Sequence, residues 1–66
     1  MQVVAQISKG YKIVTDVTTF EVLGNMKLRG KYLYKVLDKK TNRVVSISRD
    51  DVLQAQIEGS AKVIGV

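Results

Sequence analysis

The sequence contains no cysteine and no histidine. Without cysteine there is no disulfide and no thiolate nucleophile or metal ligand, and nothing marks a redox compartment. Without histidine, the usual general base and a common zinc ligand are missing as well. The serines, Ser8, Ser46, Ser48 and Ser60, have no evident activating base. We therefore expect no enzymatic activity, no cofactor, no metal site and no small-molecule substrate.

The six carboxylates are the remaining candidates for catalytic or metal chemistry. Asp50 and Asp51 are adjacent and in principle suit a hard cation, but their spacing from Ser48 favours helix-capping acids. Asp16 and Asp38 lie in expected turns, where aspartate is common because it bonds nearby backbone amides. The five glycines are scattered and form no phosphate-binding loop.

Long hydrophobic runs are also missing. No apolar stretch approaches the ~20 residues that span a bilayer, and the start lacks the pattern of a secretory signal. We expect a cytoplasmic protein that does not bind membranes. Its 66 residues allow one domain, residues 1–66. A chain of this length buries only about 60% of the surface that its unfolded form exposes, so a stability of a few kcal/mol is expected.

A strict alternation is present in the middle of the chain. From Phe20 to Val36 every even position is apolar, except for the glycines at positions 24 and 30. Successive side chains of a strand point to opposite faces, so this period predicts one apolar and one charged face. The apolar set is Phe20, Val22, Met26, Leu28, Tyr32, Tyr34 and Val36.

The rest of the pattern completes the expected elements. Strands are predicted at residues 3–7, 11–15, 20–23, 31–37, 43–47 and 61–66, and one short helix at residues 48–58. We expect an α+β domain: a strongly bent antiparallel β-sheet or partly open small β-barrel, with the helix packed against it and a final strand. The predicted core is Val4, Ile13, Phe20, Val22, Met26, Leu28, Tyr32, Tyr34, Val36, Val45, Ile47, Leu53 and Ile57.

Several ends and turns have specific signals. Ser48 is the expected N-cap of the helix and Gly59 its C-terminal stop. In the loop of residues 38–42, the aspartate should bond the turn amides, and Asn42 suits the left-handed conformation. At Gly30 a three-residue turn, residues 29–31, places Leu28 opposite Tyr32 and keeps the apolar face continuous, as does a single strand bent at the glycine. A two-residue turn would break that face.

Positive charge is concentrated in one stretch. Residues 27–43 hold seven cationic side chains and one aspartate, whereas the residues before them sum to zero and those after to minus one. The predicted binding residues are Lys27, Arg29, Lys31, Lys35, Lys39, Lys40 and Arg43. Such a field attracts nucleic acid or an acidic protein surface. Lysines on exposed strands also keep sheets soluble and prevent edge pairing, so this plain explanation remains open.

Two functional classes follow. The first is a small basic module that contacts nucleic acid through a Lys/Arg-rich strand face. Tyr32 and Tyr34 would stack bases in such a module, although their parity favours the core. The second is a protein-interaction module, either a regulator or inhibitor of another protein or a small structural homodimer. Leu23 and Leu33 support it, because both lie among the lysines on the charged side.

The run from Tyr34 (YKVLDKKTNRVVSISRDDVLQ) to Gly59 resembles the hairpin-then-helix tail of small proteins encoded by phages and prophages of Gram-positive bacteria. The resemblance covers about half of the chain and carries over no functional residue. It implies a bacterial cytoplasmic setting and a binding role directed at a host protein.

Overall fold

The computed structural model describes residues 3–65. It has five strands and one helix, which are β1 (Lys12–Thr15), β2 (Thr19–Leu28), β3 (Lys31–Asp38), β4 (Arg43–Ser48), α1 (Arg49–Glu58) and β5 (Ala61–Ile64). All neighbouring strands are antiparallel, and they form one sheet in the order β4-β3-β2-β1-β5. The two edge strands do not pair with each other, so the sheet is open. The predicted α+β class with a single short helix is confirmed.

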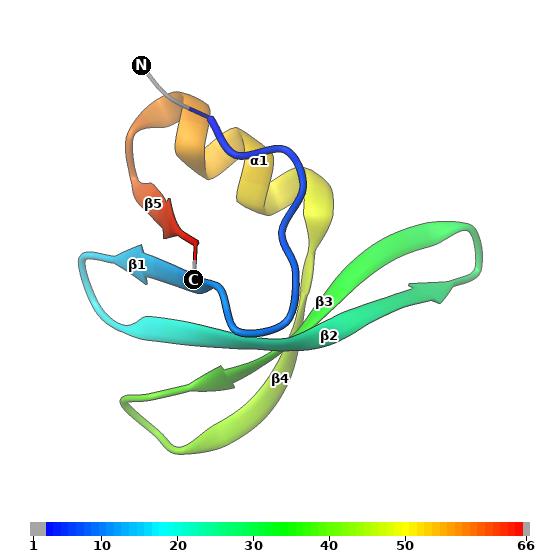
Figure 1. The fold of residues 1–66 in the computed structure, drawn as a ribbon, viewed down its shortest axis with the longest axis horizontal. Coiled ribbons are helices and arrows are strands. Elements are labelled where there is room, and N and C mark those ends of the chain that lie inside the picture. Colours follow the sequence, from blue (N-terminus) through cyan, green and yellow to red (C-terminus); the bar gives the residue numbers. More distant parts are fainter. Residues whose placement is uncertain (1–2, 66) are drawn as a thin grey trace.

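The strands twist strongly around one another, and α1 lies on one side of the sheet beside the irregular segment of residues 3–8 (Figure 1). We call this side of the sheet the inner face and the opposite side the outer face. The hairpin of β2 and β3 extends well beyond the helix (Figure 1). Among residues 3–65 no helix is long and apolar enough to cross a membrane.

The predicted caps and the predicted loop are confirmed. The Ser48 hydroxyl accepts a hydrogen bond from the Asp50 amide at 3.2 Å, and Gly59 ends the helix in the left-handed conformation with φ 84°. In the loop between β3 and β4, an Asp38 carboxylate oxygen accepts a hydrogen bond from the Lys40 amide at 2.9 Å. Asn42 has φ 58°, as its side chain allows at a turn end. Local chemistry therefore determines these ends.

A β-bulge at Leu23 reverses the predicted alternation in the second half of β2. Val22 lies opposite Val36 and Gly24 lies opposite Lys35, so Leu23 is one residue too many for the partner strand. Such an extra residue moves every later side chain of its strand to the other face. Beyond the bulge, the odd-numbered residues of β2 share the inner face with the even-numbered residues of β3.

The turn between β2 and β3 follows from the bulge. Leu28 lies opposite Lys31, so the turn has two residues, Arg29 and Gly30, with φ 52° and 79°. Positive φ at both central residues is the type I′ pattern, whose twist matches that of the flanking strands. The predicted three-residue turn is wrong, and so is the single bent strand, because the extra residue is accommodated at Leu23.

The core lies between the inner face, α1 and the segment 3–8. Its buried apolar residues are Ile7, Ile13, Val22, Tyr34, Val36, Val52 and Val63, with Val4, Phe20 and Ile47 among those packed partly buried against it. Six predicted core residues are 38 to 55% exposed instead: Met26, Leu28, Tyr32, Val45, Leu53 and Ile57. Met26 and Leu28 lie on the outer face because of the bulge, and Val45 lies on the edge strand β4.

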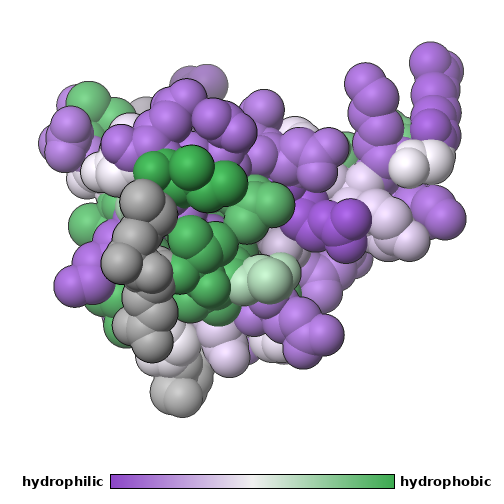
Figure 2. Space-filling view, turned by 90° about the horizontal axis from the view of Figure 1, so that it is seen from above, coloured by the Kyte–Doolittle hydropathy of each residue, from purple (hydrophilic) through white to green (hydrophobic). Residues whose placement is uncertain are grey.

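The helix packs on the sheet through a different row of side chains from the predicted one. Val52 and Gln56, one turn apart, are buried, whereas Leu53 and Ile57 are exposed. Both pairs have the same helical spacing, so the sequence alone does not distinguish them. Apolar surface is visible from above, the side on which α1 lies (Figure 2).

The predicted first strand, residues 3–7, is wrong. Segment 3–8 forms no ladder with the sheet; Ile7 is buried in the core, and the side chain of Gln56 binds the backbone of Val4. The final strand is present as β5, which ends at Ile64, and Val66 of the predicted strand lies outside the described residues.

Candidate nucleic-acid interface

The structure does not bring the seven predicted cationic residues onto one face. Lys27 lies on the inner face, opposite Tyr32, whereas Lys31 and Lys35 lie on the outer face. Arg29 is in the β2–β3 turn. The remaining three, Lys39, Lys40 and Arg43, lie at the opposite end of β3, roughly 25 Å away at the usual rise per residue. The predicted row of Lys27, Arg29, Lys31 and Lys35 on one strand face is therefore wrong, because the bulge and the β2–β3 turn separate its members.

The group at the β3–β4 turn is partly neutralised by carboxylates. The Lys39 ammonium forms an ion pair with Glu21 at 2.8 Å, and this hydrogen bond lowers the pKa of the Glu21 carboxyl. Arg43 lies opposite Asp38 on the neighbouring strand. Cations with carboxylates beside them attract an anion less than isolated ones, so this end of the sheet is the weaker candidate.

We call residues 24–35, the end of the β2–β3 hairpin that extends beyond the helix, the arm. The arm contains four cationic residues and no acidic residue. The rest of the chain has seven cationic and six acidic residues. One of those seven, Arg49, adjoins the arm, so the arm and Arg49 together carry five positive charges, equal to the net charge of +5. Hydrophilic side chains project from the far end of the hairpin, at the right of Figure 2.

Tyr32 lies between two of these cations on the inner face. The Lys27 ammonium is 5.2 Å from the centre of the Tyr32 ring, and the Arg49 guanidinium carbon is 4.2 Å from it. The sheet explains this arrangement: Lys27 is the cross-strand neighbour of Tyr32 on β2, and Arg49 follows β4, the strand on the other side of β3. Tyr32 is 47% exposed, so it is a surface aromatic residue with cations on its ring rather than a core residue.

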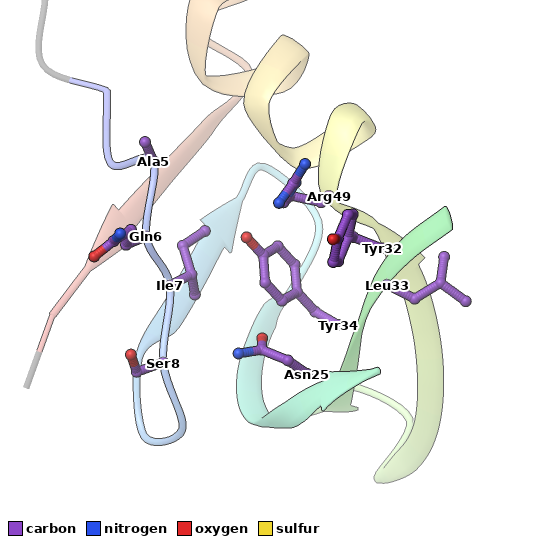
Figure 3. Close-up of a pocket in the computed structure, with 9 residues that line it drawn as sticks. All are labelled: Ala5, Gln6, Ile7, Ser8, Asn25, Tyr32, Leu33, Tyr34 and Arg49. Atoms are coloured by element: carbon purple, nitrogen blue, oxygen red, sulfur yellow. The ribbon is translucent and has the colours of Figure 1, made fainter. Parts of the chain in front are cut away.

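A hollow of about 340 Å³ lies next to Tyr32, between segment 3–8 and the arm. Ile7 forms one wall, Tyr34 and Asn25 form the floor, and Arg49 lies above the Tyr34 hydroxyl (Figure 3). A second hollow of about 250 Å³ shares Ile7, Tyr34 and Arg49 and continues along α1. The hollow therefore combines apolar walls with a few polar groups, as small-ligand sites do.

The Tyr34 ring is buried, but its hydroxyl is directed toward Arg49 at the hollow (Figure 3). Burial raises the pKa of this hydroxyl, and the charge of Arg49 partly opposes the increase. Tyr34 therefore stays neutral at physiological pH and is able to donate or accept a hydrogen bond. Among residues 3–65, no fully buried side-chain polar atom lacks a partner, so this hydroxyl is not a sealed, unsatisfied group.

The outer face has a different character. Met26, Leu28 and Val44 are exposed there beside Lys31 and Lys35. Leu23 and Leu33, which the sequence placed among the lysines, are half-buried. No helix formed by residues 3–65 covers this face, since α1 lies on the inner side (Figure 1).

Sequence reasoning missed Asn25 and Arg49 as inner-face residues. Gly24 was the available signal for the first, because a glycine inside a strand pattern marks a bulge and therefore a change of side. For the second, Arg49 follows Ile47 by two residues, so the alternation of β4 continues to the inner face at the start of α1.

Within residues 3–65 there is no cluster of three or more acidic, cysteine or histidine side chains that would hold a metal ion. Comparison with known proteins gives no match to a family model, to a curated protein or to a solved structure.

Proposed function

We propose that the protein is a non-enzymatic cytoplasmic binding module that contacts single-stranded nucleic acid with the inner face of its arm. The observation that carries this proposal is the exposed ring of Tyr32 between Lys27 and Arg49, on an arm without acidic residues. Proteins that bind single strands combine aromatic side chains, on which bases stack, with cations that follow the phosphates. Arg49 contributes in both ways, because bases also stack on guanidinium planes.

The exposed aromatic ring favours a single strand over a duplex. In a duplex the bases already stack on one another, so the Tyr32 ring would have no free base face to contact. Lys27 does not block the ring permanently, since its side chain is exposed and a lysine stem is flexible. When a phosphate draws the ammonium group away, that part of the ring becomes available to a base.

Fluorescence anisotropy with labelled oligothymidine, and with a duplex of the same length, tests this proposal at two ionic strengths. We expect the single strand to bind more tightly and the affinity to fall with salt. With three to four phosphate contacts, the slope of log K against log salt should be about −2 to −3. Equal or tighter binding of the duplex, or no binding of either at low salt, would contradict the proposal.

Variants of the arm locate the contact. Lys27→Gln should weaken binding several-fold and reduce the salt slope by about 0.7, whereas Lys35→Gln is the matched control because it removes the same charge from the outer face. Tyr32→Leu should weaken binding about tenfold, and Tyr32→Phe should retain it because the ring remains. Equal effects of Lys27→Gln and Lys35→Gln would show that the inner face is not the contact surface.

The exposed apolar residues of the outer face support a second candidate function, a protein-interaction module. In a phage-type protein this would be binding to a host protein or formation of a homodimer. Light scattering over a concentration series tests the homodimer. A molar mass that rises with concentration in the wild type, but stays at the monomer value in Leu28→Glu, would support it. A monomer at all concentrations, together with the expected oligonucleotide binding, would favour the first function.

A further inference from the structure

The hollow beside Tyr32 has two polar groups, on Tyr34 and Asn25, that the proposed phosphate binding and stacking do not use, and it shares Arg49 with that contact surface. The Tyr34 hydroxyl, the Arg49 guanidinium and the Asn25 amide all line it. Within residues 3–65, none of these three side chains forms a hydrogen bond or an ion pair. Convergent polar groups without hydrogen-bond partners in the protein, in an otherwise apolar hollow, are typical of a ligand site.

The size of the hollow limits the ligand. Pockets for small ligands range from about 300 to 1,000 Å³, and at about 340 Å³ this one is at the lower end. Ile7 and Tyr34 both line it (Figure 3), and a flat ring packs well against such apolar surface. Tyr32 also lines the hollow, so an occupant lies beside the ring on which the proposed strand stacks.

We infer that this hollow holds one unpaired base of the bound strand, with Arg49 and Asn25 contacting its hydrogen-bonding edge. The inference rests on the proposed function and adds that the site reads one base. The guanidinium offers paired N–H donors, which match the adjacent O6 and N7 acceptors of guanine. The asparagine amide offers one donor and one acceptor, and the Tyr34 hydroxyl is able to do either. Guanine is therefore the base that this set of groups recognises best.

A series of oligothymidines with one central substitution tests the inference. The central nucleotide is deoxyguanosine, deoxyadenosine, deoxycytidine, thymidine or an abasic site, and binding is measured by anisotropy at constant salt. We expect the guanine oligonucleotide to bind most tightly and the abasic one about tenfold more weakly, which is the range of effects known for a bound base.

Two conservative variants assign the effect to the hollow. Asn25→Ala removes an exposed amide, and Tyr34→Phe removes one hydroxyl while the buried ring remains. Both should reduce the difference between guanine and abasic oligonucleotides at least threefold and leave the salt slope unchanged. Gln54→Ala, which removes a side-chain amide exposed on α1, is the matched control and should leave the difference intact. Urea denaturation of each variant confirms that it is folded.

The outcomes separate the two proposals. If all five oligonucleotides bind equally and with the same salt slope, or if the preference is the same in Asn25→Ala and Tyr34→Phe as in the wild type, the base site is wrong while the proposed function remains. If no oligonucleotide binds at low salt, the proposed function fails, and the base site fails with it.

Discussion

The side-chain amide of Gln56 forms two hydrogen bonds with the backbone of Val4. The Val4 amide donates to Gln56 Oε1 at 2.8 Å, and Gln56 Nε2 donates to the Val4 carbonyl oxygen at 3.0 Å. A carboxamide carries one donor side and one acceptor, as a peptide group does, so Gln56 takes the place of a neighbouring strand. This pairing explains how a polar residue of α1 is buried and how segment 3–8 is held without a β-ladder.

Replacing Gln56 by alanine should therefore release segment 3–8. We expect the free energy of unfolding to fall by about 1–3 kcal/mol, because two partly buried backbone groups lose their partners. Urea denaturation measures the loss, and amide exchange at Val4 should become faster. Gln54→Ala is the control, because Gln54 bonds only the exposed Glu58 side chain. A similar loss in both variants would contradict the role of the Gln56 side chain.

The buried side of α1 is tested by two adjacent residues. Val52→Ala should reduce the free energy of unfolding by about 1–3 kcal/mol, because Val52 is buried in the core and its truncation leaves a cavity. Leu53→Ala should cost less than about 1 kcal/mol, since Leu53 is exposed. Urea denaturation of both variants measures the difference. A larger loss in Leu53→Ala than in Val52→Ala would instead support the helix orientation that the sequence predicted, with Leu53 in the core.

Two glycines of the hairpin should respond differently to alanine. Gly30 has φ 79°, where a Cβ is disfavoured although no atom lies within 4 Å of the place it would occupy. Gly30→Ala should therefore destabilise by about 1 kcal/mol through the backbone alone. Gly24→Ala meets no atom within 4 Å either and needs no positive φ, so it should be neutral or stabilise by a few tenths of a kcal/mol. Thermal denaturation distinguishes the two, and equal midpoints would argue against the two-residue turn.

The β3–β4 loop should make stability depend on pH. The Thr18 hydroxyl donates a hydrogen bond to Asp38 and is the largest cause of a lowered pKa of that carboxyl; the Lys40 amide also contributes. A carboxyl whose pKa is lower in the folded state stabilises the fold above its ordinary pKa, near 4, and this contribution is lost as pH falls through the lowered value. Thr18→Val should thus have a lower melting temperature than the wild type at pH 7.

The difference between the wild type and Thr18→Val should narrow as pH is lowered below about 4, because protonation of Asp38 weakens in the wild type the hydrogen bond that the variant already lacks. Circular dichroism melting at pH 7, 4 and 2.5 provides the measurement. Thr18→Ser retains the hydroxyl and should follow the wild type. A difference that stays constant over this range would show that Thr18 acts only through packing.

The fold class, the caps of α1 and the β3–β4 loop were predictable, whereas the extent of β2 and the β2–β3 turn were not. The Ser48 hydroxyl suits an N-cap, and Gly59, without a side chain, suits the left-handed end of a helix. Asn42 suits a turn residue with positive φ. The orientation of α1 was not predictable, since the pair Val52 and Gln56 and the pair Leu53 and Ile57 have equal spacing. Tertiary contacts with Val4 select the first pair.

The site was predictable only in its charge. The sequence predicts Lys27 and Arg29 as part of a cationic stretch, but the alternation of residues 20–36 assumes that β2 and β3 pair without an extra residue. The misassigned side of Lys27 follows from that assumption. Tyr32 lies on the predicted side, but it is exposed because the hairpin extends beyond the helix (Figure 1). Arg49 was treated as part of a capped helix start, and its contact with Tyr32 depends on which strand lies beside β3.

The extra residue at Leu23 makes β2 one residue longer than its pairing with β3 requires. Gly24 already lies opposite Lys35 and Asn25 opposite Tyr34, so a deletion of Leu23 would give unbroken pairing without moving any later side chain to the other side. The loss of this single codon would therefore leave the oily surface of Met26 and Leu28 and the charged surface of Lys27 in place, and the binding specificity of the hairpin would tolerate it.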